Sequence, residues 1–341
     1  MANKIPKRHH YVPRVYLKSW TNESGLIAFR RRDNSTHVLT STLNVAVEKG
    51  FHGVGQEAIE REKFFGKLET QWPRLRQSLV DGKPLDSEAR NTIARFLAYQ
   101  RARNREERSR AEFHKSVTRF LGNRTLDNSS IREFLVEHWG TSNPTPGEIA
   151  GARTYAEIFR HKDFSDDFSL DVVKMTDTMD IMSDLLKAFT WRVERMPKAE
   201  LLTSDAPVVY WRKRSPKDKF EGIGPTGAEE IWFPLDPLHL LVLAKTPGKL
   251  GLWKMSTKRL TFVNREIASR CYEAIIGSPS SSGLIDSFTL SPKKPALRFN
   301  IAPGYERDSS GNDVLMSGEI LHTWVPAYDD ILDIPTGRQE N

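Results

Sequence analysis

Apolar residues recur every three or four positions between Gln56 and Val80, a spacing that predicts a long amphipathic helix. The residues of this stripe are Phe65, Leu68, Trp72, Leu75 and Leu79. We expect Pro73 to kink the helix, because proline removes one backbone donor and clashes with the preceding turn.

Two more helices follow from the same periodicity. One runs from about Ser87 to Phe120, and another is marked by a stripe of methionine and other apolar residues between Val172 and Phe189. The methionines are interpreted as core residues rather than a cofactor site. The proline- and glycine-bearing stretch 140–148 separates helical segments.

After Thr190 the pattern changes to short runs of β-branched and aromatic residues between polar or proline-bearing turns. These runs are "WRVERM", "AELLTSD", "PVVYW", "EEIWFPL" and "LHLLVLA". They predict a mainly antiparallel sheet, with a helix over 263–276 packed against it and a flexible loop over 277–283. The tail after Asp330 reads as weakly ordered.

Helices in the first half and strands in the second predict an α+β fold, in which the helical half packs on a mainly antiparallel or mixed sheet. We expect one compact domain with internal subdivisions. They are a basic N-terminal segment with short strands (1–50), a helical part (51–190), a β-rich part (191–330) and a tail (331–341).

The N-terminal segment "KRHHYVPRVYLKSW" has an unusual order of polar and apolar residues. Pro13 favours the first helical position and an extended conformation before it, so the chain should run extended to residue 12. His9 and Tyr11 would then share one face and His10 the other. One histidine could be a structural anchor while the other serves a functional site near the helix N-terminus. Two strands, 26–32 and 36–40, are expected next.

Composition narrows the protein class. The 341 residues contain no apolar run close to the length needed to span a bilayer and no signal peptide, which predicts a soluble cytoplasmic protein without a membrane partner. The single cysteine, Cys271, excludes a disulfide framework and is expected to be a buried apolar residue.

The net charge of +7 is concentrated in two places. Residues 1–32 carry eight Lys and Arg against one Glu, and residues 90–119 carry nine against three. Such segments could bind nucleic acid or another polyanion, but solvated helix faces have the same composition.

The apolar face of the second long helix continues into Gln100, Arg101 and Arg105. A buried guanidinium without a partner is costly, so these arginines must contact carboxylates, a bound anion or water. If the helix leaves the core at this point, they are simply solvated.

Two acidic residues precede prolines by one or two positions in the predicted sheet. They are Asp205, which follows Ser204 in "TSDAPVVYW", and Asp236 in "FPLDPLHL". Because proline interrupts strand pairing, both should lie at strand ends or bulges. Each could be a turn cap, a general base or a metal ligand.

Familiar catalytic signatures are missing from the sequence. The "GVG" at 53–55 lacks the remaining features of a dinucleotide fingerprint, and there is no Walker loop, zinc-protease helix or nucleophile elbow. The acidic stretch 161–168 does not have the spacing of an EF-hand and is interpreted as a loop with a helix cap.

The motifs "HHYVPRVYL", "FLAYQRARNREER", "LLTSDAPV" and "FPLDP" followed by "LVLA" resemble, in this order, the domain of unknown function 4238 family. The resemblance runs from about Arg8 to Ile276, with Trp20 where the family pattern ends in phenylalanine. The resemblance implies which positions recur in the family, but it implies no activity. They are His9, His10, Tyr11, Pro13, Leu17, Gln100, Arg101, Arg105, Ser204, Asp205, Pro207, Pro234 and Asp236.

We hypothesise that these polar positions form one cluster, with the N-terminal segment against the sheet edge beside the second helix. The preferred interpretation is a hydrolase for phosphodiester or nucleotide substrates. Its catalytic residues would be His9, His10, Asp205 and Asp236, and its substrate-binding residues Tyr11, Gln100, Arg101, Arg105 and Ser204. A divalent metal, Mg²⁺ or Mn²⁺, could assist, although spacing does not identify its ligands.

Two other interpretations stay open. The cluster could belong to a non-catalytic regulatory module that binds nucleic acid or another anion, or it could be a buried ion-pair network that only stabilises the fold. The sequence does not identify a protein partner.

Overall fold

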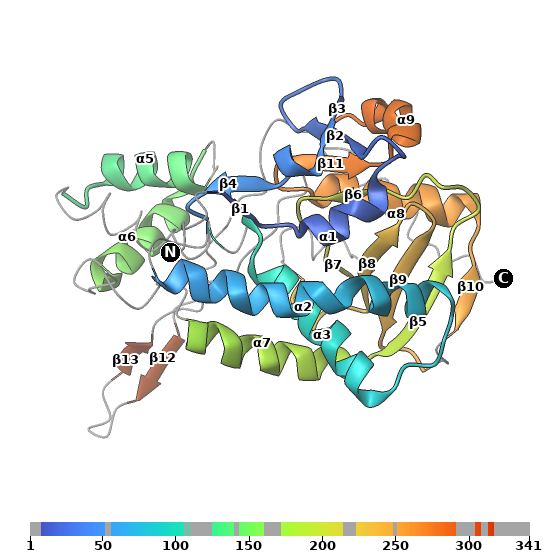
Figure 1. The fold of residues 1–341 in the computed structure, drawn as a ribbon. Coiled ribbons are helices and arrows are strands. Elements are labelled where there is room, and N and C mark those ends of the chain that lie inside the picture. Colours follow the sequence, from blue (N-terminus) through green and yellow to red (C-terminus); the bar gives the residue numbers. More distant parts are fainter. Residues whose placement is uncertain are drawn as a thin grey trace.

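The computed structural model (Figure 1) describes most of the chain. The described residues are 8–51, 56–105, 108, 125–139, 143–159, 172–213, 223–247, 251–290, 304–307 and 313–316. The acidic stretch 161–168 and the tail 331–341 lie outside them.

The N-terminal segment has the predicted order of an extended stretch followed by a short helix. The elements up to residue 49 are β1 (Arg8–His10), α1 (Arg14–Leu17), the 3-10 helix η1 (Lys18–Trp20), β2 (Leu26–Arg31), β3 (Val38–Ser41), the 3-10 helix η2 (Thr42–Asn44) and β4 (Val47–Lys49). Pro13 is the N-cap of α1 with ψ of 135°, which ends the extended stretch. Tyr16 and Trp20 are fully buried and anchor the short helix to the core.

Five longer helices follow in the described part of the chain. They are α2 (Gln56–Val80), which contains Pro73, α3 (Ser87–Ala102), α5 (Asn128–Trp139), α6 (Pro146–Phe159) and α7 (Val172–Lys187). The predicted single helix from Ser87 to Phe120 is wrong in its continuity, because α3 ends at Ala102. Arg103 leaves the helical conformation with ψ of 20°. The stretches 106–107 and 109–124 lie outside the described residues.

The two larger sheets have five and four strands. The five-stranded sheet has the order β10-β5-β9-β8-β7, and all its pairs are antiparallel except β10 with β5. Its strands are β5 (Thr190–Arg195), β7 (Val209–Trp211), β8 (Glu230–Asp236), β9 (His239–Ala244) and β10 (Leu252–Lys254). As predicted from the prolines, Asp236 ends a strand at a register shift after Pro234, and Asp205 directly follows β6 (Thr203–Ser204).

The four-stranded sheet has the order β3-β2-β11-β6. Its strand β11 (Ala274–Gly277) comes after α8 (Thr257–Arg270), so the predicted helix over 263–276 is wrong over its last six residues. Ile275 and Ile276 pair with β2 on one side and β6 on the other, and these partners are distant in sequence. The predicted flexible loop 277–283 instead contains the 3-10 helix η4 (Pro279–Ser281) and the start of α9 (Ser282–Ser287).

The five-stranded sheet is covered on both faces. Phe233 of β8 packs edge-on against Trp72 of α2, with ring centroids 5.5 Å apart, and Trp72 stacks on Phe96 of α3 at 4.2 Å. Trp232, which precedes Phe233 in β8, packs against Phe262 of α8 with ring centroids 5.9 Å apart. Because successive side chains of a strand point to opposite faces, the sheet lies between the helices α2 and α3 and the helix α8 (Figure 1).

A four-charge network joins α8 to this sheet. Arg192 and Arg259 both contact Glu194 and Glu230 at 2.7 to 3.0 Å, and both glutamates are buried. Burial acts to raise the pKa of Glu230, but the two guanidinium groups outweigh it and lower the pKa to about 2. This network ties the position of α8 to strands β5 and β8.

The predicted α+β class is confirmed: helices dominate the first half, and the larger sheet is built from the second half. A two-stranded hairpin of β12 (Gly304–Arg307) and β13 (Asp313–Met316) completes the described elements. The subdivision at residues 50, 190 and 330 stays a prediction. Among the described residues, none of the helices combines the length and the apolar composition needed to cross a membrane.

Candidate functional site

His9 and His10, the two histidines predicted to be catalytic, have different surroundings. His9 is 2% exposed and lies opposite Glu48 in the β1–β4 pair. The His10 ring donates from Nε2 to the Thr42 carbonyl at 3.2 Å. Burial lowers the pKa of His10, and the nearby positive charge of Arg14 adds to this effect. Thus His10 is neutral near pH 7 and faces η2.

Tyr11 joins the N-terminal segment to the end of α3. The Gln100 side chain donates from Nε2 to the Tyr11 carbonyl at 3.1 Å, and both residues are buried. The guanidinium of Arg105 lies over the Tyr11 ring, 5.2 Å from its centroid. The predicted proximity of the N-terminal segment and the second long helix is therefore observed here.

Arg105 is held by two carboxylates that the sequence did not identify. It pairs with Glu48 of β4 at 2.7 Å and with Glu273, which precedes β11. Arg108 also contacts Glu48, at 3.2 Å. The sequence left carboxylates, a bound anion or water as partners of Arg105, and the structure shows that carboxylates are its partners.

Asp205 belongs to the same neighbourhood. Its two carboxylate oxygens accept hydrogen bonds from the backbone N–H groups of Tyr272 at 2.9 Å and Glu273 at 2.7 Å. Ser204 Oγ accepts from the N–H of Ala206 at 3.1 Å, which fixes the turn after β6. Burial raises the pKa of Asp205 to about 6, although the backbone donors act in the opposite direction.

These contacts define a group that we call the Arg105 cluster. Its members are Tyr11, Gln100, Arg105, Asp205, Glu48 and Glu273. Burial raises the pKa of the Tyr11 hydroxyl above its usual range, and the negative charges of Asp205 and Glu273 add to this effect. The cluster joins β1, β4, α3 and the loops before β7 and β11.

Asp236 has a different set of partners. It accepts from the N–H groups of Leu238 and His239 and from the His239 ring at 2.8 to 2.9 Å, and it pairs with Arg76 of α2 at 3.4 Å. Burial acts to raise its pKa, but the contacts with His239 outweigh it and lower the pKa. Asp236 therefore caps the β8–β9 turn and contacts α2 instead of the Arg105 cluster.

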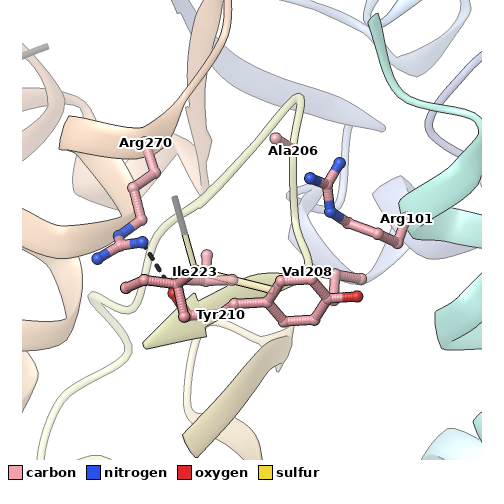
Figure 2. A pocket seen from close by; sticks show the side chains of 7 residues that line it. Arg101, Ala206, Val208, Tyr210, Ile223 and Arg270 are labelled. Carbon is pink, nitrogen blue, oxygen red and sulfur yellow. Dashed lines mark hydrogen bonds between the residues drawn. The ribbon is translucent and has the colours of Figure 1, made fainter. Parts of the chain in front are cut away.

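A pocket of about 30 Å³ lies beside the cluster (Figure 2). Its lining residues are Arg101, Ala206, Val208, Val209, Tyr210, Ile223 and Arg270. Two of its walls adjoin the Arg105 cluster, because Arg101 follows Gln100 on α3 and Ala206 follows Asp205. In Figure 2 the side chains of Arg101 and Arg270 enter from opposite sides, with Tyr210 between them.

Arg270 is held rigidly at the end of α8. Its Nε and Nη2 donate to Glu266 Oε2 at 3.2 and 2.9 Å, and its Nη1 donates to the Tyr210 carbonyl at 2.8 Å (Figure 2). A guanidinium has five N–H bonds. Within the described part of the chain, two of them remain for a further acceptor.

Arg101 supplies the second guanidinium from α3. It lies 5.5 Å from the centroid of the Tyr210 ring, a distance typical of a cation–π contact. The pocket thus combines two formal positive charges from separate elements. Among the described lining residues, none has a carboxylate.

Sequence reasoning missed Glu48, Glu273, Tyr210 and Arg270. The signal for the two glutamates was indirect: a buried arginine needs a partner, of which a carboxylate is one kind, but the local sequence does not identify the residue that supplies it. Arg270 and Tyr210 had no signal, because their proximity depends on how α8 packs beside β7. Within the described ranges, no group of three His, Cys, Asp or Glu side chains is arranged to hold a metal ion.

Cys271 has the surroundings expected of a core residue. It is fully buried, and Arg32 Nη2 lies 3.2 Å from its sulfur. Burial raises the pKa of the thiol to about 12, which disfavours a thiolate.

No curated protein and no solved structure matches this chain. Residues 8–281 match the family described as "Protein of unknown function (DUF4238)", and this range contains both the Arg105 cluster and the pocket. The chain therefore belongs to the DUF4238 family, as the order of its motifs predicted.

Proposed function

We propose that this protein binds an anionic ligand in the pocket between Arg101 and Arg270. The supporting observation is that guanidinium groups from two different elements line one small pocket without a lining carboxylate among the described residues. Charge-assisted hydrogen bonds from guanidinium groups to carboxylate or phosphate oxygens are among the strongest in proteins.

The position of Arg270 favours binding because it is fixed before a ligand arrives. Glu266 and the Tyr210 carbonyl hold three of its N–H donors, so little side-chain entropy remains to be lost on binding. Arg101 is restrained differently, by the cation–π contact of its guanidinium with the Tyr210 ring. This preorganisation supports a specific anion site over a surface that attracts anions only by net charge.

Isothermal titration of the purified protein with sodium acetate and with sodium phosphate tests this proposal. The variant Arg270→Lys keeps the positive charge but removes the planar fork, and Lys258→Gln on the exposed start of α8 is its control. We expect one of these anions to bind, with at least about tenfold weaker binding in Arg270→Lys, since a hydrogen bond to a charged group contributes about 1.5–3 kcal/mol. Circular dichroism confirms that the variants fold. Binding that is absent, or equal in both variants, contradicts the proposal.

Nucleic acid is one form that the anion could take, given the basic segments 1–32 and 90–119. Binding to duplex DNA would weaken with salt at a logarithmic slope of about −0.9 per phosphate contacted. A single anion in a pocket gives a much shallower dependence. A salt titration with an oligonucleotide duplex therefore separates these two kinds of ligand.

Hydrolysis of a phosphodiester or nucleotide is the second candidate function, and Asp205 is the observation that favours it. Its pKa of about 6 lies in the range of general acids and bases, and Ala206, which follows it, lines the pocket. This proposal assigns proton transfer to Asp205 and charge stabilisation to Arg101. His9 lies near the cluster because it is opposite Glu48 in the β1–β4 pair.

A cleavage assay tests the hydrolase candidate. Single- and double-stranded DNA and RNA are incubated with the wild type and Asp205→Asn, with and without Mg²⁺ or Mn²⁺. Cleavage by the wild type that the folded variant lacks would favour the enzyme. Anion binding without cleavage would favour the anion-binding function over the hydrolase.

A further inference from the structure

We propose that the open edge of strand β10 binds an extended, acidic segment of a partner protein, which adds to the five-stranded sheet as a further strand. This surface is separate from the anion pocket, because β7, which lines the pocket, is the strand at the opposite edge of the sheet. The inference therefore goes beyond the proposed anion binding and does not depend on it. Three features of the described residues carry it: open backbone groups, exposed side chains and positive charge.

The backbone of β10 is paired on one side only. It is the last strand in the order β10-β5-β9-β8-β7, next to β5 (Figure 1). The Gly251 carbonyl accepts a hydrogen bond from β5 at 3.0 Å, and the Met255 N–H donates to the Arg195 carbonyl at 2.9 Å. Because backbone groups along a strand point alternately to its two sides, the N–H and C=O groups of Leu252 and Lys254 point away from β5. An extended chain laid along this edge would bond to these four groups.

The side chains of β10 are exposed along the whole strand. Leu252 and Trp253 are each 46% exposed, and Lys254 is exposed beside them. Successive side chains point to opposite faces, so each face of the sheet has an exposed apolar residue at this edge. An open edge of this kind is a template for pairing with another chain. An added strand would therefore bury apolar surface on both faces.

One face of this edge is positively charged. Lys254 lies opposite Arg195 of β5, and opposed residues of paired strands have their side chains on the same face. Both side chains are exposed, and within the described part of the chain neither has an ion pair. We call these two residues the positive row. Residues 245–265 add to this charge, since they include six Lys and Arg and no Asp or Glu.

Carboxylates near this edge already have partners. Glu194 lies opposite Trp253 in the β10–β5 pair, but it is buried and pairs with Arg192 at 2.8 Å. Asp81, in the turn after α2, pairs with Lys83 at 2.7 Å. Because neither carboxylate compensates the positive row, a negative side chain of the partner would do so.

These features define the chemistry of the partner. Its segment alternates acidic residues, which lie beside the positive row, with apolar residues, which lie beside Trp253 on the other face. A nucleic-acid strand has no backbone N–H groups to pair with the edge. A second copy of β10 would bring another lysine to the edge instead of a carboxylate.

Fluorescence anisotropy with labelled probes tests the inference. The first probe is a seven-residue peptide of alternating glutamate and valine, called the Glu–Val peptide. The others are a Lys–Val peptide of the same length, a Glu–Val peptide with N-methylated backbone amides, and a seven-nucleotide oligothymidine. We expect the unmodified Glu–Val peptide to bind. The N-methylated peptide should not bind, because it has the same charges but lacks the donors that pair with the edge.

Two variants separate the charge from the backbone. Lys254→Glu should weaken binding of the Glu–Val peptide about tenfold and allow the Lys–Val peptide to bind, because a favourable charge pair becomes a repulsive one and the reverse. Leu252→Pro removes an outward N–H and leaves the β5 pairing intact, so it should abolish binding. Lys67→Glu on the exposed side of α2 is the charge control, and Arg270→Lys is the control for the anion pocket. Both should bind the peptide like the wild type, and circular dichroism confirms folding.

Several results would overturn the inference. Absence of Glu–Val binding would do so, as would equal binding of the N-methylated peptide, which would show attraction by charge alone. Tighter binding of oligothymidine would identify a nucleic-acid surface instead. A dimer in analytical ultracentrifugation that Leu252→Pro dissociates would show that a second copy of the chain occupies the edge. Peptide binding lost in Arg270→Lys but kept in Lys254→Glu would place the peptide in the anion pocket.

Discussion

The buried carboxyl group of Asp205 should make the free energy of unfolding depend on pH. Burial raises its pKa from 3.8 to about 6 in the folded protein. Between these values the folded state binds more protons at Asp205 than the unfolded state does, so its contribution to stability falls as the pH rises. The shift corresponds to about 3 kcal/mol in full, of which about 2 kcal/mol is lost between pH 4 and pH 7.

The variant Asp205→Asn isolates this contribution, because an amide does not titrate and has nearly the same shape. Urea unfolding of both proteins at pH 4, 5, 6 and 7 gives the difference between their free energies of unfolding. We expect the variant to gain about 2 kcal/mol relative to the wild type as the pH rises. The absolute stability of the variant is lowered at every pH, since its NH₂ group faces a backbone N–H that the carboxylate accepted.

The control for this series is Asp184→Asn on α7, where the side chain is 74% exposed. It makes the same chemical change at the surface. A difference between wild type and Asp205→Asn that stays within about 0.5 kcal/mol from pH 4 to 7 would refute the reasoning. So would a difference that changes in the opposite direction.

Three further substitutions test the packing around the site. Glu230→Gln should destabilise the protein by about 3–5 kcal/mol in urea unfolding at pH 7, because two partly buried guanidinium groups lose a shared, buried carboxylate. The loss should shrink as the pH falls from 4.5 towards 2, where the wild-type carboxylate becomes protonated. A loss that stays constant over this range would contradict the prediction. Gly277→Ala should cost about 1–3 kcal/mol, since its Cβ would lie 2.9 Å from Leu202 Cδ2; an unchanged melting temperature would show that the neighbours adjust freely. Tyr16→Phe should cost about 0.5–1.5 kcal/mol by removing the 2.6 Å hydrogen bond to Thr203 Oγ1, and a neutral effect in urea unfolding would mean that this bond contributes nothing.

Local patterns were sufficient for several elements. The spacing of Trp72 and its neighbours determines α2, and Pro13 marks the change from extended to helical backbone. The prolines beside Asp205 and Asp236 indicated strand ends, where both residues lie. In each case the physical cause acts within a few residues.

Other features depend on contacts between distant parts of the chain. The stretch "AIIG" reads as the end of a helix from its own pattern, but it forms β11 because β2 and β6 supply hydrogen-bond partners on both sides. The pairing of Arg105 with Glu48 and Glu273 is likewise set by the packing of β4 and β11 against α3. The pocket combines α3, β7 and α8, so only the assembled fold reveals it.

The most direct test of anion binding compares two single-charge variants of α3. Arg101→Gln removes a guanidinium from the pocket, whereas Arg95→Gln removes one that pairs with Asp180 at the surface. Titration of both variants and the wild type with sodium acetate and sodium phosphate should show at least about tenfold weaker binding of the bound anion for Arg101→Gln and unchanged binding for Arg95→Gln. Equal affinity in all three proteins would contradict the account, because the pocket would then not be where the anion binds.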